Sequence, residues 1–428
     1  MEKKIVLLPS KQMDANKKAE RNEQKLIRMP KFVRSVLEAE DSDIEIAGKT
    51  DKTLNLSVFK AFSEDLKSAM ATLSVEALSK VCFVTTDNFN SLGGTGKPFI
   101  ELSASNTFLS MLIGTDPELL LMKEGEVINA SNVLTNNKTA KFGADGAMAE
   151  LRPSPAKTPE DLVNNIRAVL HDENNIKGID KYDWVSACYI DKPAGRDYPV
   201  GMHIHIDNPH KIEKLDINQR LRLFSVTNKI LDELLTLPLI RLDGKEGHSR
   251  RARCKMSAHN GFSLNKYGKG YGFFGEWREA YGRLEHRSLS GLVLSRPDLC
   301  RAVFGTAKAI AEAVYSTAIK NKLDGDFILP DKFGMRGVYS ENFASWDQIP
   351  LASHFGCVAP SKDIAKTMDA SSRDEITVNY INKWVKRMRT LPTYNKFKDD
   401  IETLKDILTC SAKTLDSIEK NIKLTWKE

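Results

Sequence analysis

Four short segments of this 428-residue sequence each carry two polar side chains separated by one residue. Residues two apart on a β-strand point to the same face, so each segment, if it is a strand, presents both side chains on one side of a sheet. The four pairs are Asp116 with Glu118, Glu150 with Arg152, His203 with His205, and Glu285 with Arg287. Any one pair also fits the solvated outer face of an antiparallel sheet, and only the four together indicate chemistry.

The residue types in these pairs suit a metal-dependent phosphate site. Carboxylate oxygens and neutral imidazole nitrogens are ligands for Mg²⁺ or Mn²⁺. Arginines beside them provide planar donors for phosphate oxygens. Carboxylates gathered on one face repel each other, and a bound divalent cation removes that repulsion. The set therefore predicts a site for ATP phosphates and phosphoryl transfer, although the glycine-rich SLGGTGKPF (91–99) lacks the pattern of a Walker loop.

The elements that must position these pairs mix strands and helices without a regular βαβ alternation, which favours an α+β fold with a largely antiparallel sheet. Thr158 and Pro159 mark the start of one helix, as N-cap and first helical residue. The expected strands are 111–122, 127–134, 143–153, 183–190, 201–207 and 283–289, and the longer expected helices cover about 217–236 and 298–320. The predicted regions are an N-terminal extension of unknown role (1–105), a catalytic domain (106–355) and a helical C-terminal region (356–428).

The composition is that of an ordinary globular protein, with 41% hydrophobic and 28% charged residues. No apolar run approaches the roughly 20 residues needed to cross a bilayer, and the apolar stretch near the N-terminus is too short for a secretory signal. The six cysteines are far apart and show no CxxC spacing, which favours reduced thiols. We therefore expect a cytoplasmic protein with no membrane partner.

Positive charge is concentrated between residues 241 and 287, a stretch that contains eleven Lys or Arg and only five Asp or Glu. Such a cluster indicates an anionic ligand, and a solvated surface loop explains it equally well. The basic segment GHSRRARCKM (247–256) is expected to be a loop, either closing over ATP or merely solvated. A nucleic acid is a less favoured partner for it. The helix around Trp384 is expected to dock on the core rather than to contact DNA or a protein partner.

Several motifs resemble those of glutamine synthetase. GMHIHID (201–207) is similar to its Gly-Met-His-x-His signature, whose first histidine ligates a metal. The DPE of IGTDPELLL resembles its paired acidic ligands, and the EHR of RLEHRSL resembles its Glu-x-Arg. Together with GADGAMAELRPSP and YGKGYGFFGEWR, these motifs most resemble the phage-type carboxylate–amine ligases of the glutamine synthetase superfamily. The resemblance covers about residues 112–290.

The resemblance implies a glutamine synthetase-like domain with a curved, mostly antiparallel sheet flanked by helices, using ATP and Mg²⁺ or Mn²⁺. The implied metal ligands are Asp116, Glu118, Glu150, His203 and Glu285. Arg287 would meet the γ-phosphate, and Arg278 and Arg152 would meet phosphate or the substrate carboxylate. Arg287, Arg278 and Glu118 are the expected catalytic residues. His205 would bind ATP or substrate, or orient the site from behind the ligands.

The implied activity is ATP-dependent joining of a carboxylate to an amine through an acyl phosphate, in a phage-encoded protein of the host cytoplasm. Glutamine synthesis itself is not predicted, because the ammonia site and adenine pocket of glutamine synthetase have no recognisable counterparts. The two substrates stay open between small molecules, peptides and proteins, and so does the oligomeric state. The alternatives are a kinase of the same fold acting on guanidino or carboxylate groups, and a non-catalytic phage assembly or binding protein.

Overall fold

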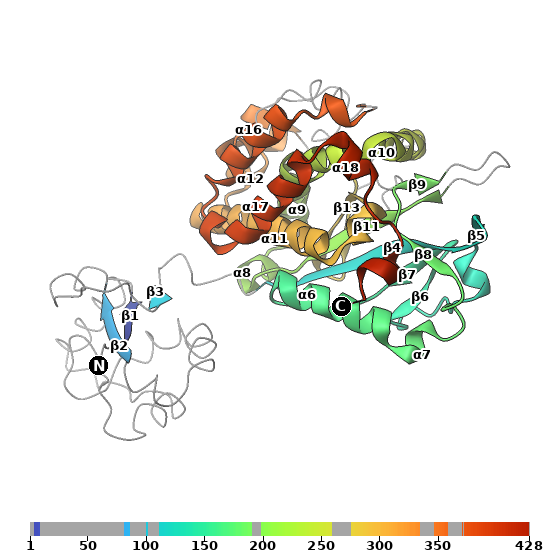
Figure 1. Cartoon of the computed structure of the whole chain (residues 1–428). Helices are drawn as coiled ribbons and strands as arrows, with labels where there is room; N and C mark the ends of the chain where they lie inside the picture. Colours follow the sequence, from blue (N-terminus) through green and yellow to red (C-terminus); the bar gives the residue numbers. More distant parts are fainter. Residues whose placement is uncertain are drawn as a thin grey trace, which may run out of the picture. The chain divides into compact units, whose positions relative to one another are not determined.

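The computed structural model in Figure 1 describes residues 111–190, 198–258, 275–333, 346–357, 370 and 372–427, and three short strands nearer the N-terminus. The chain divides into two compact units, Met1–Leu109 and Ser110–Glu428. In the first unit, β1 (Lys4–Leu8) pairs in parallel with β2 (Val81–Thr85) and β3 (Ile100–Glu101). The candidate site lies entirely in the second unit.

The second unit is built on one eight-stranded sheet, with the order β12-β13-β11-β4-β7-β6 and with β5 and β8 also paired to β4. Every described pairing in this sheet is antiparallel, which confirms the predicted α+β class. The strands are β4 (Ile113–Lys123), β5 (Glu126–Ile128), β6 (Phe142–Asp145), β7 (Met148–Leu151), β8 (Asp183–Val185), β11 (Gly201–Ile206), β12 (Trp277–Ala280) and β13 (Arg283–Ser290). A separate ribbon pairs β9 (Tyr189–Ile190) with β10 (Tyr198–Pro199).

Strand β4 is the central strand of the sheet, and its core residues Leu119, Leu120 and Leu121 are fully buried. It continues into β5 through a tight turn at Glu124 and Gly125, whose φ angles are 52° and 81°. Two consecutive positive φ angles are typical of the type I′ turns that match the twist of hairpin strands. The predicted pair of strands joined by a turn is therefore present, although β5 ends at Ile128.

Helices cover the sheet and confirm the main helical predictions (Figure 1). Helix α6 (Pro159–His171) begins after Thr158, whose side chain accepts a hydrogen bond from the Asp161 amide as an N-cap should. The other long helices are α9 (Ile217–Leu231), its π-helical continuation η2 (Asp232–Thr236), α10 (Leu237–Ala258) and α11 (Pro297–Lys320). The short helices are α7 (Glu173–Ile176), α8 (His210–Glu213), α12 (Gly325–Ile328) and α14 (Pro350–His354).

The prediction of a loop at 247–256 is wrong, because this segment is helical and α10 extends to Ala258. At Gly244 the backbone is not helical, with φ 58° and ψ −142°, so α10 consists of two helical stretches that meet at a kink there. Arg250 is buried, and its guanidinium donates to the carbonyl oxygens of Ser288 and Leu289 at 2.9 and 2.8 Å. These bonds hold the basic segment against the sheet, which a loop closing over ATP would not allow. Of the following GYGFFG (270–275), only the final Gly275 lies within the described residues.

The C-terminal helices belong to the same compact unit as the sheet. Helix α17 (Lys398–Thr409) packs against α11 and against α16 (Val378–Met388), and both α16 and α17 contact α10 (Figure 1). Helices α18 (Ala412–Asp416) and α19 (Ile422–Thr425) follow. Ile381 and Trp384 of α16 are buried, which confirms that this amphipathic helix docks on the core. In the described part of the chain, no helix is both long and apolar enough to span a membrane.

Candidate active site

The register of the sheet brings the predicted side chains together on one face. On β11, His203 lies opposite Asp116 of β4, and His205 lies opposite Glu285 of β13. Glu118 of β4 lies opposite Glu150 of β7. A cavity of about 630 Å³ opens on this face, and its lining includes Asp116, Glu150, Arg152, His203, His205, Arg278, Glu285 and Arg287. The period-two spacing thus predicted a real convergence of four strands.

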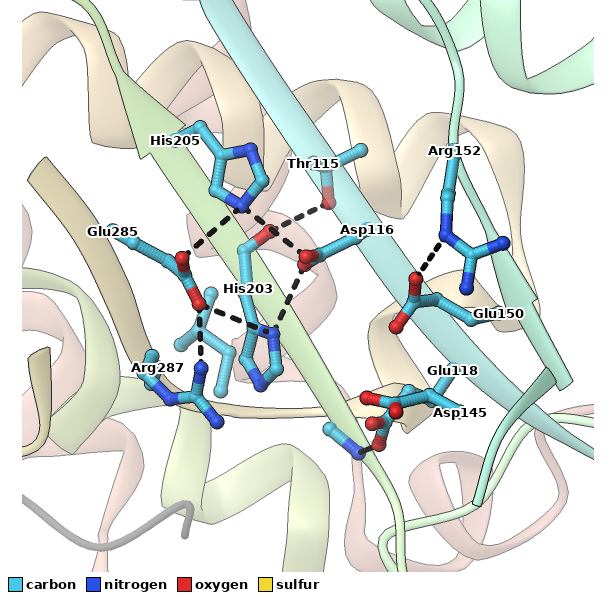
Figure 2. Close-up of polar contacts among 12 residues, drawn as sticks. Thr115, Asp116, Glu118, Asp145, Glu150, Arg152, His203, His205, Glu285 and Arg287 are labelled. Carbon is cyan, nitrogen blue, oxygen red and sulfur yellow. Dashed lines mark hydrogen bonds and ion pairs between the residues drawn. The ribbon is translucent and has the colours of Figure 1, made fainter. Parts of the chain in front are cut away.

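One half of the site contains two histidines between two carboxylates (Figure 2). Asp116 Oδ1 lies 3.0 Å from His203 Nδ1, and Asp116 Oδ2 lies 3.3 Å from His205 Nε2. Glu285 is further away, with its two oxygens 3.7 Å from His203 Nδ1 and 3.8 Å from His205 Nε2. Ligand-capable atoms of Asp116, His205 and Glu285 all lie within 4.8 Å of one another. This trio includes the second histidine of GMHIHID, whereas the resemblance had implied the first.

The other half of the site is a group of three carboxylates from β4, β6 and β7, those of Glu118, Asp145 and Glu150. Their oxygens also lie within 4.8 Å of one another. Glu118 is fully buried, and its Oε2 accepts a hydrogen bond from the Gly201 amide at 2.7 Å. Asp145 was not among the predicted residues. It ends β6 just before a glycine turn, where an aspartate is most simply explained by the turn itself.

Arginines neutralise part of this negative charge. Arg278 Nε lies 2.5 Å from Glu285 Oε2, and Arg287 Nη1 lies 2.6 Å from Glu285 Oε1. Arg287 also donates through Nε to Glu276 at 3.0 Å, so its guanidinium is held from two sides. Arg152 lies 2.5 Å from Glu150 and donates to three main-chain carbonyls, those of Asn137, Ala140 and Ala144. These contacts anchor Arg152 at the edge of the cavity.

The two halves differ in their electrostatics. Burial raises the pKa of Asp116, but the charges of His205 and His203 outweigh it and hold that pKa well below its usual value. Burial likewise opposes the ionisation of Glu285, and its neighbours, above all His203, lower its pKa. Burial and the Asp116 charge instead raise the pKa of Glu150 to about 7. In the three-carboxylate half, burial opposes the ionisation of Asp145, but Lys138 lies 3.0 Å from it and lowers its pKa. The charge of Glu150, by contrast, is not fully balanced by its protein neighbours.

The donor set fits a hard divalent cation. Oxygen ligands with one or two imidazoles are the combination that Mg²⁺ and Mn²⁺ accept. Among the described residues, Asp116 Oδ1 and His205 Nε2 are buried atoms without a hydrogen-bond partner of good geometry. Both atoms lie in ion pairs within the site, 3.0 Å from His203 Nδ1 and 3.3 Å from Asp116 Oδ2, so it is the chemistry of the donor set that fits a cation.

The fold and the cavity define an α+β protein that gathers carboxylates, imidazoles and arginines on one face of an antiparallel sheet. Residues 113–327, half of the chain, match the family model described as phage phiEco32-like COOH.NH2 ligase-type 2. The chain belongs to this family of carboxylate–amine ligases, as its motifs predicted. The matched range contains all nine predicted site residues and Asp145.

Two other comparisons add less. A solved structure described as "Apo GmaS without ligand" is similar with a TM-score of 0.35 and 13% sequence identity, over 68% of this chain and 72% of that chain. The search of curated proteins gave no match.

Proposed function

We propose that this protein is an ATP-dependent carboxylate–amine ligase that uses Mg²⁺ or Mn²⁺ and forms its amide through an acyl phosphate. The observation that carries the proposal is the convergence of five carboxylates, two imidazoles and three arginines on one face of the sheet, in a chain of a carboxylate–amine ligase family. The phage origin and the cytoplasmic location belong to the same proposal, and the phage-type family supports the origin.

Two groups of side chains would hold the cations. Asp116, His205 and Glu285 form one group, and Glu118, Asp145 and Glu150 form the other. His203 lies beside Asp116 and Glu285, so it would act as a ligand or as a partner that orients them. When bound, divalent cations neutralise the phosphate oxygens and make the γ-phosphorus more electrophilic.

The reaction needs no covalent intermediate with the enzyme. A carboxylate oxygen of the substrate attacks the γ-phosphorus of ATP, and the bond to the bridging oxygen breaks with its electron pair leaving on ADP. The amine then attacks the carbonyl carbon of the acyl phosphate, inorganic phosphate leaves, and the amine loses a proton. Arg287 and Arg278 line the cavity. Their guanidinium groups are suited to bind the phosphate oxygens, among which negative charge moves during the transfer.

The experiment that tests this function is trapping with hydroxylamine. The protein is incubated with ATP, Mg²⁺, hydroxylamine and either candidate carboxylates or a host lysate, and ADP and hydroxamates are measured. We expect both products with the wild type and neither with Glu118→Gln or Glu285→Gln. Glu279→Gln is the matched control, because Glu279 is half-buried in the same hairpin, where its Oε1 accepts from the Gly282 amide, but it does not line the cavity, and glutamine keeps an accepting oxygen.

The alternatives give different results in the same experiment. ADP without any hydroxamate would favour a kinase that acts on a guanidino group. A wild-type protein that binds no ATP at millimolar metal would contradict both enzymes and favour the non-catalytic binding protein. Loss of product in Glu279→Gln as well would show that the losses in the cavity variants do not come from the site.

A further inference from the structure

Strand β13 carries Glu285 and Arg287 into the cavity and is fixed from its opposite face. There, His286 and Ser288 are buried against the helix formed by α9 and η2. His286 Nε2 lies 2.9 Å from Thr236 Oγ1. Ser288 Oγ donates to an Asp232 carboxylate oxygen at 2.7 Å. Hydrogen bonds to the η2 turn therefore hold the strand directly behind its two cavity residues.

A third helical side chain completes this contact and defines the histidine tautomer. Asn228 Nδ2 donates to Asp232 Oδ2 at 3.3 Å, which turns Asn228 Oδ1 toward His286 Nδ1, 2.6 Å away. Since an amide oxygen only accepts, His286 carries its proton on Nδ1, and Nε2 accepts from the Thr236 hydroxyl. Both ring nitrogens are thus engaged, and the ring has one hydrogen-bonded orientation.

The π-helical form of η2 explains why three residues of one helix can face the same strand. Asn228, Asp232 and Thr236 are four residues apart. In an α-helix, each step of four residues overshoots a full turn by about 40°, so the third residue would rotate away from the strand. A π turn is wider, and a four-residue step within it falls short of a full turn. The turn at Asp232–Thr236 therefore brings Thr236 back toward β13.

Asp232 also holds the segment that orients Arg287. Its Oδ2 accepts a hydrogen bond from the Gly275 amide at 2.7 Å. The next residue, Glu276, accepts from Arg287 through its side chain at 3.0 Å and through its carbonyl at 3.2 Å. The Asp232 carboxylate thus bonds both to β13 and to the segment that carries Glu276, and these two together set the position of the Arg287 guanidinium.

The other side of the η2 turn is held by the C-terminal region. Trp384 Nε1 of α16 donates to the carbonyl oxygen of Leu234 at 2.6 Å. Arg387 Nη1 of the same helix lies 2.5 Å from Glu233 Oε1. Both partners belong to the five residues of the π turn. Helix α16 therefore braces the turn from the side opposite to β13.

We propose that the π turn Asp232–Thr236 is a positioning element, which sets Glu285 and Arg287 in the cavity and is itself braced by α16. Thr236, Asp232 and His286 are positioning residues, since none of them lines the cavity. The inference rests on the proposed function for its catalytic consequence, and it gives the C-terminal helices a role at the active site.

The test compares Thr236→Val with Thr227→Val. Both threonines are buried in the same continuous helix, but Thr227 Oγ1 bonds to the Leu223 carbonyl within the helix, at 2.7 Å, and not to β13. Mn²⁺ affinity is measured by calorimetry, and kcat and KM for ATP by hydroxamate formation. We expect Thr236→Val to weaken Mn²⁺ binding about tenfold and to lower kcat more than it changes KM, with Thr227→Val close to wild type. Thr236→Ser, which keeps the hydroxyl, should restore both.

Equal Mn²⁺ affinities for Thr236→Val, Thr227→Val and wild type would overturn the positioning role. Because Mn²⁺ binding needs no turnover, it separates the two proposals: a wild type that forms no hydroxamate contradicts the ligase, whatever the affinities show. Should Thr236→Val not fold, Trp384→Phe takes its place, since it keeps an aromatic ring in the core but removes the N–H that bonds to Leu234, along with part of the indole. It should weaken Mn²⁺ binding in the same direction, and wild-type affinity in a folded Trp384→Phe protein would refute the brace.

Discussion

Replacing Glu150 by glutamine should make the metal-free protein more stable and should reduce the stabilisation that Mg²⁺ provides. Glu150 is buried in the three-carboxylate half of the site, with its side chain 7% exposed, and Arg152 is its ion-pair partner. Burial and the nearby Asp116 charge raise its pKa from 4.5 to about 7. The ionised side chain therefore destabilises the metal-free fold even with Arg152 in contact. A neutral amide of the same shape removes that effect.

The size of the effect follows from the difference in pKa between the folded and unfolded chains. A shift from 4.5 to about 7 corresponds to about 3 kcal/mol, at about 1.4 kcal/mol per pKa unit. The folded protein holds this proton more tightly than the unfolded chain does. Its stability therefore falls as the pH rises from 4.5 through 7, and above pH 8 the whole penalty is present. Glu150→Gln should lack this fall.

Urea unfolding in EDTA at pH 5 and pH 8 measures this difference. We expect Glu150→Gln to be more stable than wild type at pH 8, by up to about 3 kcal/mol, and to differ much less at pH 5. Glu173→Gln is the control, because Glu173 is exposed at the start of α7. Added Mg²⁺ should stabilise the wild type, by about 2.7 kcal/mol at a hundred times its Kd, and stabilise Glu150→Gln less.

The opposite result in EDTA would refute this reasoning. If Glu150→Gln is less stable than wild type at pH 8, the contact with Arg152 outweighs the burial of the charge and the site does not depend on a cation to balance it. Equal stabilisation of both proteins by Mg²⁺ would show that Glu150 is not a ligand.

Three further predictions concern single residues. If the two groups each bind Mn²⁺, Asp145→Asn should weaken one of the two binding events about tenfold in calorimetry and leave the other unchanged. Two unchanged events would remove Asp145 from the site. Arg287→Lys should lower kcat about a hundredfold, because an ammonium group cannot bond to Glu276 and to phosphate at the same time, as the planar guanidinium can. A near-normal rate would argue against a contact between Arg287 and phosphate. Trp426→Ala should lower the free energy of unfolding, measured in urea, by about 3 kcal/mol, because the indole is buried and donates to the Leu294 carbonyl. A loss below about 1 kcal/mol would contradict tight docking of the C-terminus.

The sequence was most informative where strand periodicity and chemistry coincide. The pairs His203 with His205 and Glu285 with Arg287 required only that their segments be strands, because the period of two then fixes the face. The convergence of the strands could be expected from the shared chemistry. That both histidines would lie against Asp116 and Glu285 could not, because it depends on interstrand register, and the register shifts between Met202 and Ile204.

Other features depend on tertiary contacts that leave little local signal. Asp145 approaches Glu118 only because β6, β7 and β4 pair side by side, while its own neighbours indicate an ordinary turn. The basic segment after Gly244 was predicted to be a loop from its glycines and charges, yet it is helical, and Arg250 within it is buried and bonded to β13. The π turn at Asp232 has no sequence signature, because its geometry is set by what it contacts on β13 and α16.

The most direct test of an acyl phosphate intermediate follows an oxygen atom of the carboxylate substrate into the released phosphate. Carboxylates labelled with ¹⁸O are incubated with the protein, ATP, Mg²⁺ and hydroxylamine, and the released phosphate is analysed by mass spectrometry. If the carboxylate attacks the γ-phosphorus and phosphate then leaves from the acyl carbon, each phosphate formed carries one ¹⁸O atom from the carboxylate, and this label disappears in Glu285→Gln. Hydroxamate formed together with unlabelled phosphate would contradict an acyl phosphate intermediate.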